Sequence, residues 1–152
     1  MKKWFVMALA ACMLTGLLAG CGSKEEGSAQ VDLSAFYETL AGEYHWSEDP
    51  QTSQEGDLLM SSVEGELLES YYPGLGDIAT KQLVAKMPMM SSVVNEIVLV
   101  QCETEEDAKA AAAILQDRVD AQAEGGAWYP GPTEMWLNSS RIVSNGNYVM
   151  LV

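Results

Sequence analysis

The sequence predicts a small α+β domain: an antiparallel sheet of about four strands with helices packed on one face, in the order α-(α)-β-β-α-β-β. Three observations predict this class. Apolar residues recur at helical spacing in 31–44, a continuous apolar run lies within 93–102, and 141–152 has the pattern of a hairpin. The chain of 152 residues allows one such domain and leaves little room for a second.

Two helices are predicted in the first half of the domain. The first spans Val31–Tyr44, with Asp32 as its N-cap and a face formed by Leu33, Phe36, Tyr37, Leu40 and Tyr44. The polar stretch Glu48–Asp57, interrupted by proline and glycine, is expected to be a surface loop. A short helix is expected over Glu64–Tyr72, because its apolar residues have helical spacing and Pro73-Gly74 follows.

Two strands are expected next in the chain. Gln82–Met87 mixes β-branched and apolar residues, and Pro88 argues against a long helix there. Val93–Cys102 is the clearest strand, because the consecutive apolar residues Ile97–Val100 are typical of a strand that is covered on both faces.

A helix should follow this strand. Thr104 is a candidate N-cap, and the three acids at 105–107 suit the positive end of the helix dipole. Small and apolar residues then share one face as far as about Ala123, and Gly125-Gly126 should end the helix.

The end of the chain has a strong hairpin pattern. Ile142–Ser144 and Tyr148–Leu151 read as strands, and Asn145-Gly146 lies between them. This dipeptide accepts the positive φ angles of a type I′ turn, so we expect a tight hairpin.

The first twenty residues have the pattern of a secretory signal peptide. Lys2 and Lys3 precede the uncharged apolar run Trp4–Leu18, which has about 15 residues, whereas a transmembrane helix needs roughly 20. The sequence Leu18-Ala19-Gly20-Cys21 then resembles the lipobox of bacterial lipoproteins. In that class the thiol of the cysteine is joined to a diacylglycerol, and the chain is cut just before it. The alternative is an uncleaved membrane anchor with a chance cysteine at its end.

The lipobox resemblance implies three segments: a signal peptide at 1–20, the lipidated cysteine with a flexible linker at 21–32, and a single α+β domain at 33–152. It also implies that lipid on Cys21 holds the domain at the extracytoplasmic face of the cell membrane, because two acyl chains on one residue give stable anchoring. Cleavage would remove Cys12, which leaves Cys102 as the one possible free thiol and excludes an intrachain disulfide.

The composition excludes two classes of site. Asp and Glu number 22 against 8 Lys and Arg, and the net charge is −14, so a nucleic-acid partner is not expected. With 1 His and 3 Cys, a zinc site of Cys and His ligands is close to excluded, and no cofactor is predicted.

Several short motifs in the second half of the chain are familiar as a set. They are Tyr72–Leu75, Lys86–Met90, Asn95–Ile97, Gly126–Pro130 and Arg141–Met150. In this order, over about 58–152, they resemble a group of small lipoproteins from Gram-positive bacteria, the domain-of-unknown-function family 4358. The resemblance implies a single compact domain at the cell envelope, and it implies no catalytic or binding residue.

Aromatic residues and one arginine offer the best binding-site hypothesis. Five large rings fall in stretches expected to be Pro- and Gly-rich loops, where they either fold over a sheet edge or contact a ligand. Arg141 enters the hairpin and either pairs with a carboxylate or binds an anionic ligand. The expected binding surface comprises Tyr71, Tyr72, Trp128, Tyr129 and Arg141, while Trp136 is the fifth ring.

No metal site is predicted. Met87, Met89 and Met90 could offer soft thioether ligands to Cu(I), but methionine also fills irregular cores. The acids around 103–107 lack the ligand spacing and glycine of a calcium loop, and helix capping accounts for them.

No catalytic residue is predicted either. His45 is the single imidazole and lies beside an expected loop. Cys102 ends a strand that should be buried, and burial together with the adjacent Glu103 should raise its pKa and make it a poor nucleophile.

These observations favour a membrane-anchored, non-enzymatic binding or interaction module whose partner is an envelope protein or polymer. The alternative is a hydrolase or transferase of cell-wall polymers that uses a carboxylate pair, which would need two carboxylates about 5–9.5 Å apart.

The lipid anchor has a direct test. In a bacterial host, Cys21→Ala should stop processing, because no other side chain at this position can form the thioether, and mass spectrometry should find a heavier chain that keeps its leader and lacks lipid. A lipidated product of normal mass from this variant would refute the assignment.

Overall fold

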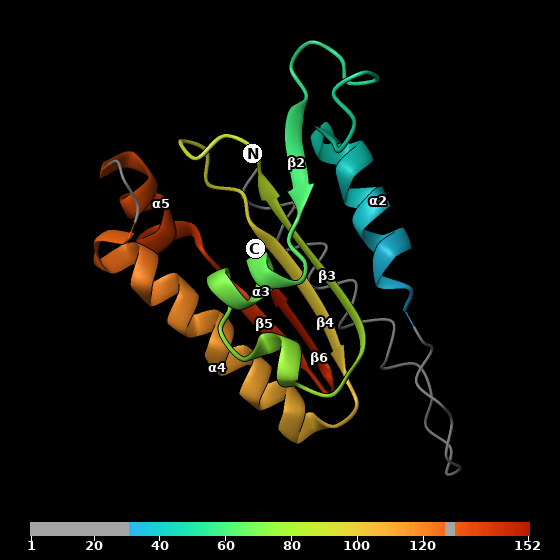
Figure 1. Cartoon of the computed structure of the whole chain (residues 1–152), viewed down its shortest axis with the longest axis vertical. Coiled ribbons are helices and arrows are strands. Elements are labelled where there is room, and N and C mark those ends of the chain that lie inside the picture. Colours follow the sequence, from blue (N-terminus) through green and yellow to red (C-terminus); the bar gives the residue numbers. More distant parts are fainter. Residues whose placement is uncertain (1–30, 127–129) are drawn as a thin grey trace, which may run out of the picture. The chain divides into compact units, whose positions relative to one another are not determined.

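A mixed sheet forms the centre of the unit Asp32–Val152 in the computed structural model, which describes residues 31–126 and 130–152 (Figure 1). Within these residues the sheet has six strands in the order β1-β2-β3-β4-β6-β5. β1 and β2 are parallel, and every other neighbouring pair is antiparallel. The strands are β1 (Trp46–Ser47), β2 (Leu58–Ser62), β3 (Thr80–Pro88), β4 (Ile97–Cys102), β5 (Ile142–Asn145) and β6 (Tyr148–Leu151).

Helices cover both faces of this sheet. α4 (Glu105–Ala121) crosses β4, β5 and β6 on one face, where Ala111 and Leu115 belong to the same buried cluster as Ala85 (Figure 1). Three further elements pack on the same face: the short α3 (Glu66–Tyr71), the 3₁₀ turn η1 (Leu75–Asp77) and α5 (Pro130–Ser139). α2 (Leu33–Tyr44) contacts β1, β3 and β4 instead. Its first amide donates to Gln82 Oε1, and side chains at odd and even positions of a strand lie on opposite faces, so α2 covers the other face.

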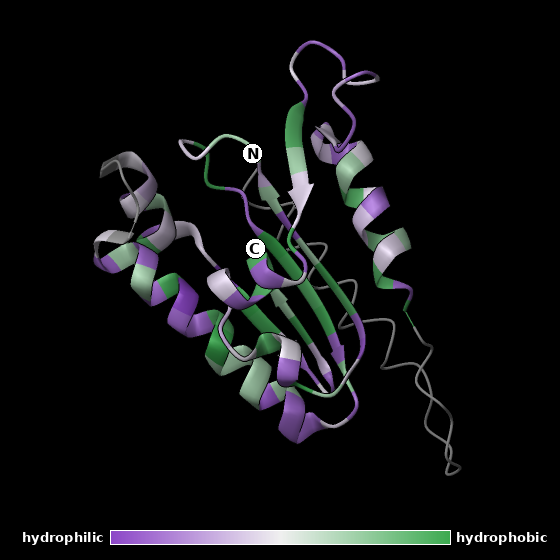
Figure 2. Ribbon diagram, in the orientation of Figure 1, coloured by the Kyte–Doolittle hydropathy of each residue, from purple (hydrophilic) through white to green (hydrophobic). Residues whose placement is uncertain are grey.

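The central strand shows the consequence of this double cover. All six residues of β4 are buried, including Gln101, whose side chain accepts a hydrogen bond from Gln82 at 2.6 Å. The central strands are hydrophobic, whereas the loop between β1 and β2 is hydrophilic (Figure 2). The prediction that 97–100 is covered on both faces is therefore confirmed.

The prediction of an α+β fold is confirmed, but its detail needs correction. The described sheet is mixed and has six strands rather than about four, and the helices lie on both faces rather than one. β2 was missed because its pattern is weak: Met60 is its single fully buried residue, and two serines follow it. Its pairing of Met60 with Pro88 is a long-range contact that local periodicity does not reveal.

Helix α5 is a second correction. Prolines and glycine at 130–132 predicted a loop, yet they occupy the first turn of a helix, where a missing backbone N–H costs nothing. This helix is fixed by the side chain of Trp136, which is buried against the core.

The helix starts and the hairpin were predicted more closely. Asp32 caps α2 by accepting from the amides of Ser34 and Ala35, and Thr104 caps α4 by accepting from the amide of Asp107. The hairpin forms, but Asn145 pairs with Tyr148, so the two turn residues are Gly146 and Asn147. Only Gly146 has a positive φ, of 57°, which is the pattern of a type II′ turn rather than the expected type I′.

A buried ion pair joins the elements on the α4 face. Arg118, near the end of α4, donates to both carboxylate oxygens of Glu96, which precedes β4, and the Tyr72 hydroxyl donates to the same carboxylate at 2.6 Å. The guanidinium also lies 4.9 Å from the ring centre of Tyr71 and 5.5 Å from that of Trp136. One cation thus contacts α3, α5 and the chain before β4.

This ion pair predicts a distinctive double-mutant result. Arg118→Met should lower the free energy of unfolding by about 3–5 kcal/mol, because it leaves the carboxylate of Glu96 buried and uncompensated. The double variant Glu96→Leu/Arg118→Met should be markedly more stable than this single variant, because no charge is then stranded. Chemical denaturation measures both, with the exposed Lys109→Met on the same helix as control. A double variant whose loss of stability equals the sum of the losses in Arg118→Met and Glu96→Leu would contradict this account.

Candidate functional site

A groove of about 600 Å³ lies between α2 and the start of α3. Ser34, Tyr37 and Glu38 form its α2 wall, and the chain from Val63 to Leu68 forms the opposite wall. Its floor is the stretch Leu83–Lys86 of β3. We call this feature the α2–α3 groove.

The groove exists because β2 leaves the sheet early. β2 pairs with β3 only from Lys86 to Pro88, and the last contact is the Val63 amide donating to Ala85 O at 2.9 Å. Gly65 then adopts a φ of 56° and turns the chain into α3. Leu83 has the same strand orientation as Ala85, so its backbone groups point away from β4. Within the described residues, no strand pairs with Leu83 on that side.

Lys86 is held firmly at one end of the groove. Its ammonium group donates to Glu48 Oε2 at 2.7 Å and to Ser62 Oγ at 2.8 Å, and it lies 5.0 Å from the ring centre of Tyr37. The side chain is 14 % exposed. Glu48 therefore already compensates this cation, which leaves the charges of Glu38 and Glu64 to set the character of the groove.

The hydroxyl of Tyr37 is the unusual group of this site. Its residue is 4 % exposed, the ring stacks on Trp46 with centroids 6.0 Å apart, and within the described residues the hydroxyl makes no well-formed hydrogen bond. Burial, and then the charge of the Glu48 carboxylate and a hydrogen-bonding interaction with it, raise the pKa of the phenol, so it keeps its proton. Glu48 is therefore the acceptor beside this hydroxyl, which is itself closed to solvent.

Comparison with known proteins adds a family. The sequence profile described as "Domain of unknown function (DUF4358)" matches residues 53–152. The chain belongs to this DUF4358 family. The foldase protein PrsA of Levilactobacillus brevis is 36 % identical over 89 residues, which cover 57 % of this chain and 25 % of that protein. The chain thus spans about a quarter of the length of that relative. No solved structure matches it.

The family match divides the groove. Glu64, Lys86 and the whole floor lie within the DUF4358 residues, whereas α2 with Tyr37 and Glu38 precedes them. The unusual phenol is therefore contributed by a helix outside the matched region.

The predicted aromatic surface of this DUF4358 protein does not hold for Tyr72. The Tyr72 residue is fully buried, and its hydroxyl donates a hydrogen bond to the buried Glu96 carboxylate. The ring of Tyr71 packs against the Arg118 guanidinium. Trp128 and Tyr129 lie outside the described residues, as do the lipobox residues Leu18, Ala19 and Gly20 and the predicted lipidation site Cys21.

Arg141 has a local structural role. Its guanidinium donates to the backbone oxygens of Asn138 and Ser140 at 3.3 and 2.6 Å, at the end of α5. The contact with Asn138 satisfies a carbonyl in the last turn of α5, where intrahelical partners are missing, and Ser140 follows the helix.

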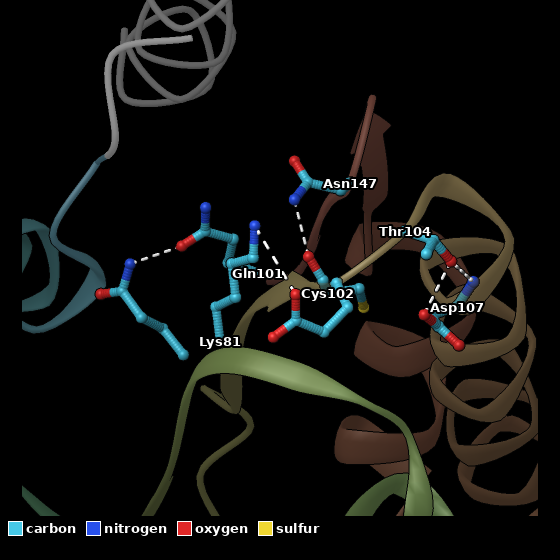
Figure 3. A network of polar contacts seen from close by, with 8 residues as sticks. Lys81, Gln101, Cys102, Thr104, Asp107 and Asn147 are labelled. Atoms are coloured by element: carbon cyan, nitrogen blue, oxygen red, sulfur yellow. Dashed lines mark hydrogen bonds and ion pairs between the residues drawn. The ribbon is translucent and has the colours of Figure 1, made fainter. Parts of the chain in front are cut away.

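The thiol of Cys102 is enclosed at the end of β4. Its residue is fully buried, and Asn147 Nδ2 donates to its backbone oxygen at 2.6 Å (Figure 3). Burial, and then the charge of Asp107, raise the pKa of this thiol, as expected for a poor nucleophile. The responsible neighbour is Asp107 rather than Glu103, which lies 3.7 Å from Lys81 Nζ.

The remaining candidate groups do not form a common site in the described residues. The His45 side chain is 78 % exposed, 3.9 Å from Asp57. Met87 packs against the core, whereas Met89 and Met90 are 58 % and 59 % exposed. No cluster of three His, Cys, Asp or Glu suited to a metal ion occurs among these residues, and no helix among them is long and apolar enough to cross a membrane.

The groove residues were missed by sequence reasoning. The sequence pattern places Tyr37 on the core face of its helix, which is correct for its ring, but such a pattern does not reveal the surroundings of its hydroxyl. Lys86 is a signal in the sequence, because a lysine inside a predicted strand needs an acidic partner. With 22 acidic residues in the chain, the sequence does not show that this partner is Glu48.

Proposed function

We propose that this protein is a lipid-anchored, non-enzymatic binding module on the extracytoplasmic face of the cell membrane, and that its ligand occupies the α2–α3 groove. The observation that carries the proposal is the edge of β3 at Leu83 in the floor of that groove, with which no described strand pairs on the side away from β4. A ligand strand placed there makes the backbone hydrogen bonds that this edge lacks within the described residues.

A polypeptide from the envelope is the best partner class. The name foldase, carried by the relative from Levilactobacillus brevis, denotes a protein that acts on other polypeptides. The lipobox ending at Cys21 supports the membrane anchor, and the acidic surface keeps the domain away from anionic lipid.

The groups with nucleophilic chemistry support a non-enzymatic role. Cys102 is buried with a raised pKa, and the imidazole of His45 is exposed to solvent. Neither residue lines the groove. The carboxylate-pair hydrolase is the alternative that the experiment must separate.

Site-specific cross-linking tests the proposal. The full-length chain is expressed in a bacterial host with photoreactive benzoylphenylalanine at Ser34, which lines the groove, or at its exposed neighbour Ala35, which does not. We expect a discrete, protease-sensitive adduct in the membrane fraction from position 34, because a bound polypeptide lies against that side chain, and none from position 35.

Two results would count against the proposed function. Equal labelling from positions 34 and 35 would remove the groove as the binding site. New reducing ends released from purified cell-wall polymer by the intact protein, and lost in Glu38→Gln or Glu64→Gln, would replace the binding module by the hydrolase.

A further inference from the structure

The α2–α3 groove contains two features that point to one kind of ligand. Its two walls carry exposed carboxylates, Glu38 from α2 and Glu64 from the turn before α3. Its floor holds the edge of β3 at Leu83, where no described strand pairs on the side away from β4.

The charges favour a cationic ligand group. Lys86 is the one basic residue that lines the groove, and the carboxylate of Glu48 and the hydroxyl of Ser62 already engage it. Within the described residues, no Lys, Arg or His forms an ion pair with Glu38 or Glu64, so these two carboxylates leave the groove negative. A partly enclosed negative groove attracts a Lys or Arg side chain and repels an acidic one.

The backbone at this edge favours an extended chain. Leu83 presents one N–H and one C=O on the side that β2 leaves at Val63, so an incoming strand can continue the line of β2 and pair there. Small amines and simple cations offer the charge without the strand.

We propose that the groove binds an extended, basic polypeptide segment by strand addition at Leu83, with a Lys or Arg side chain between Glu38 and Glu64. This inference rests on the proposed function, because it assumes that the groove is the binding site, and it names the chemistry of the ligand.

Peptide binding tests this inference with the full-length lipidated chain in detergent micelles. Three ten-residue, fluorescently labelled peptides of β-branched and polar residues serve as probes. One carries two lysines, the second has glutamates in their place, and the third is the lysine peptide with alternate backbone amides methylated. Fluorescence anisotropy should show that the lysine peptide binds at least about tenfold more tightly than the other two, because charge and strand pairing both contribute.

Matched variants assign the charge to the groove. Glu38→Gln/Glu64→Gln should weaken binding of the lysine peptide about fivefold to tenfold, because each carboxylate contributes a modest ion pair. Glu43→Gln/Glu66→Gln removes the same charge from the same two segments, at exposed positions outside the groove, and should change the affinity less than about twofold. Circular dichroism confirms that both double variants are folded.

Each contrary outcome has a defined meaning. Equal binding of the glutamate peptide would overturn the basic specificity. Equal binding of the methylated peptide would overturn strand addition and make the ligand a cationic group alone. Absence of binding by all three peptides would overturn the inference, and the cross-link from position 34 would then show separately whether the groove is still a binding site.

Discussion

The ion pair between Glu96 and Arg118 fixes the arrangement on which the groove depends. Arg118 contacts Glu96, the rings of Tyr71 and Tyr72, and Trp136, so it holds α3 and α5 against α4. With α3 held on that face, the chain after β2 must leave the sheet at Val63 to reach it. Within the described residues, the edge of β3 at Leu83 is then left without a strand on the side away from β4. A structural salt bridge on one face of the sheet thus accompanies an unpaired strand edge beside the other.

The groove wall under α2 is a packed cluster of polar groups. Lys86 donates to Glu48 and Ser62, and the buried Tyr37 hydroxyl lies beside the Glu48 carboxylate. Buried polar groups are normally hydrogen-bonded, and Tyr72 follows that rule through Glu96. The second face of the sheet is thus both a packed layer under α2 and the wall of the groove.

Local patterns predicted the elements well where one residue type dictates a conformation. Asp32 and Thr104 mark helix starts, 97–100 marks the central strand, and Gly146 marks the hairpin. Long-range pairing decided the rest: β2 is a strand because Met60 meets Pro88, and α5 is a helix because Trp136 finds the core. The same holds for the site, since the partners of Lys86 are 24 and 38 residues away in the chain. The sequence predicts that Tyr72 lies in an aromatic loop at a binding surface, whereas its buried hydroxyl donates to Glu96 of the ion pair.

The paired substitutions Tyr72→Phe and Tyr37→Phe test the central claim most directly, namely that the Glu96–Arg118 ion pair fixes the arrangement around the groove. Denaturation should show that Tyr72→Phe lowers the free energy of unfolding by about 1.5–3 kcal/mol, because its hydroxyl donates to a charged carboxylate. Tyr37→Phe should lower it less, because its hydroxyl makes no well-formed hydrogen bond within the described residues. An unchanged free energy of unfolding in Tyr72→Phe would mean that the ion pair does not hold this ring, and the account would be contradicted.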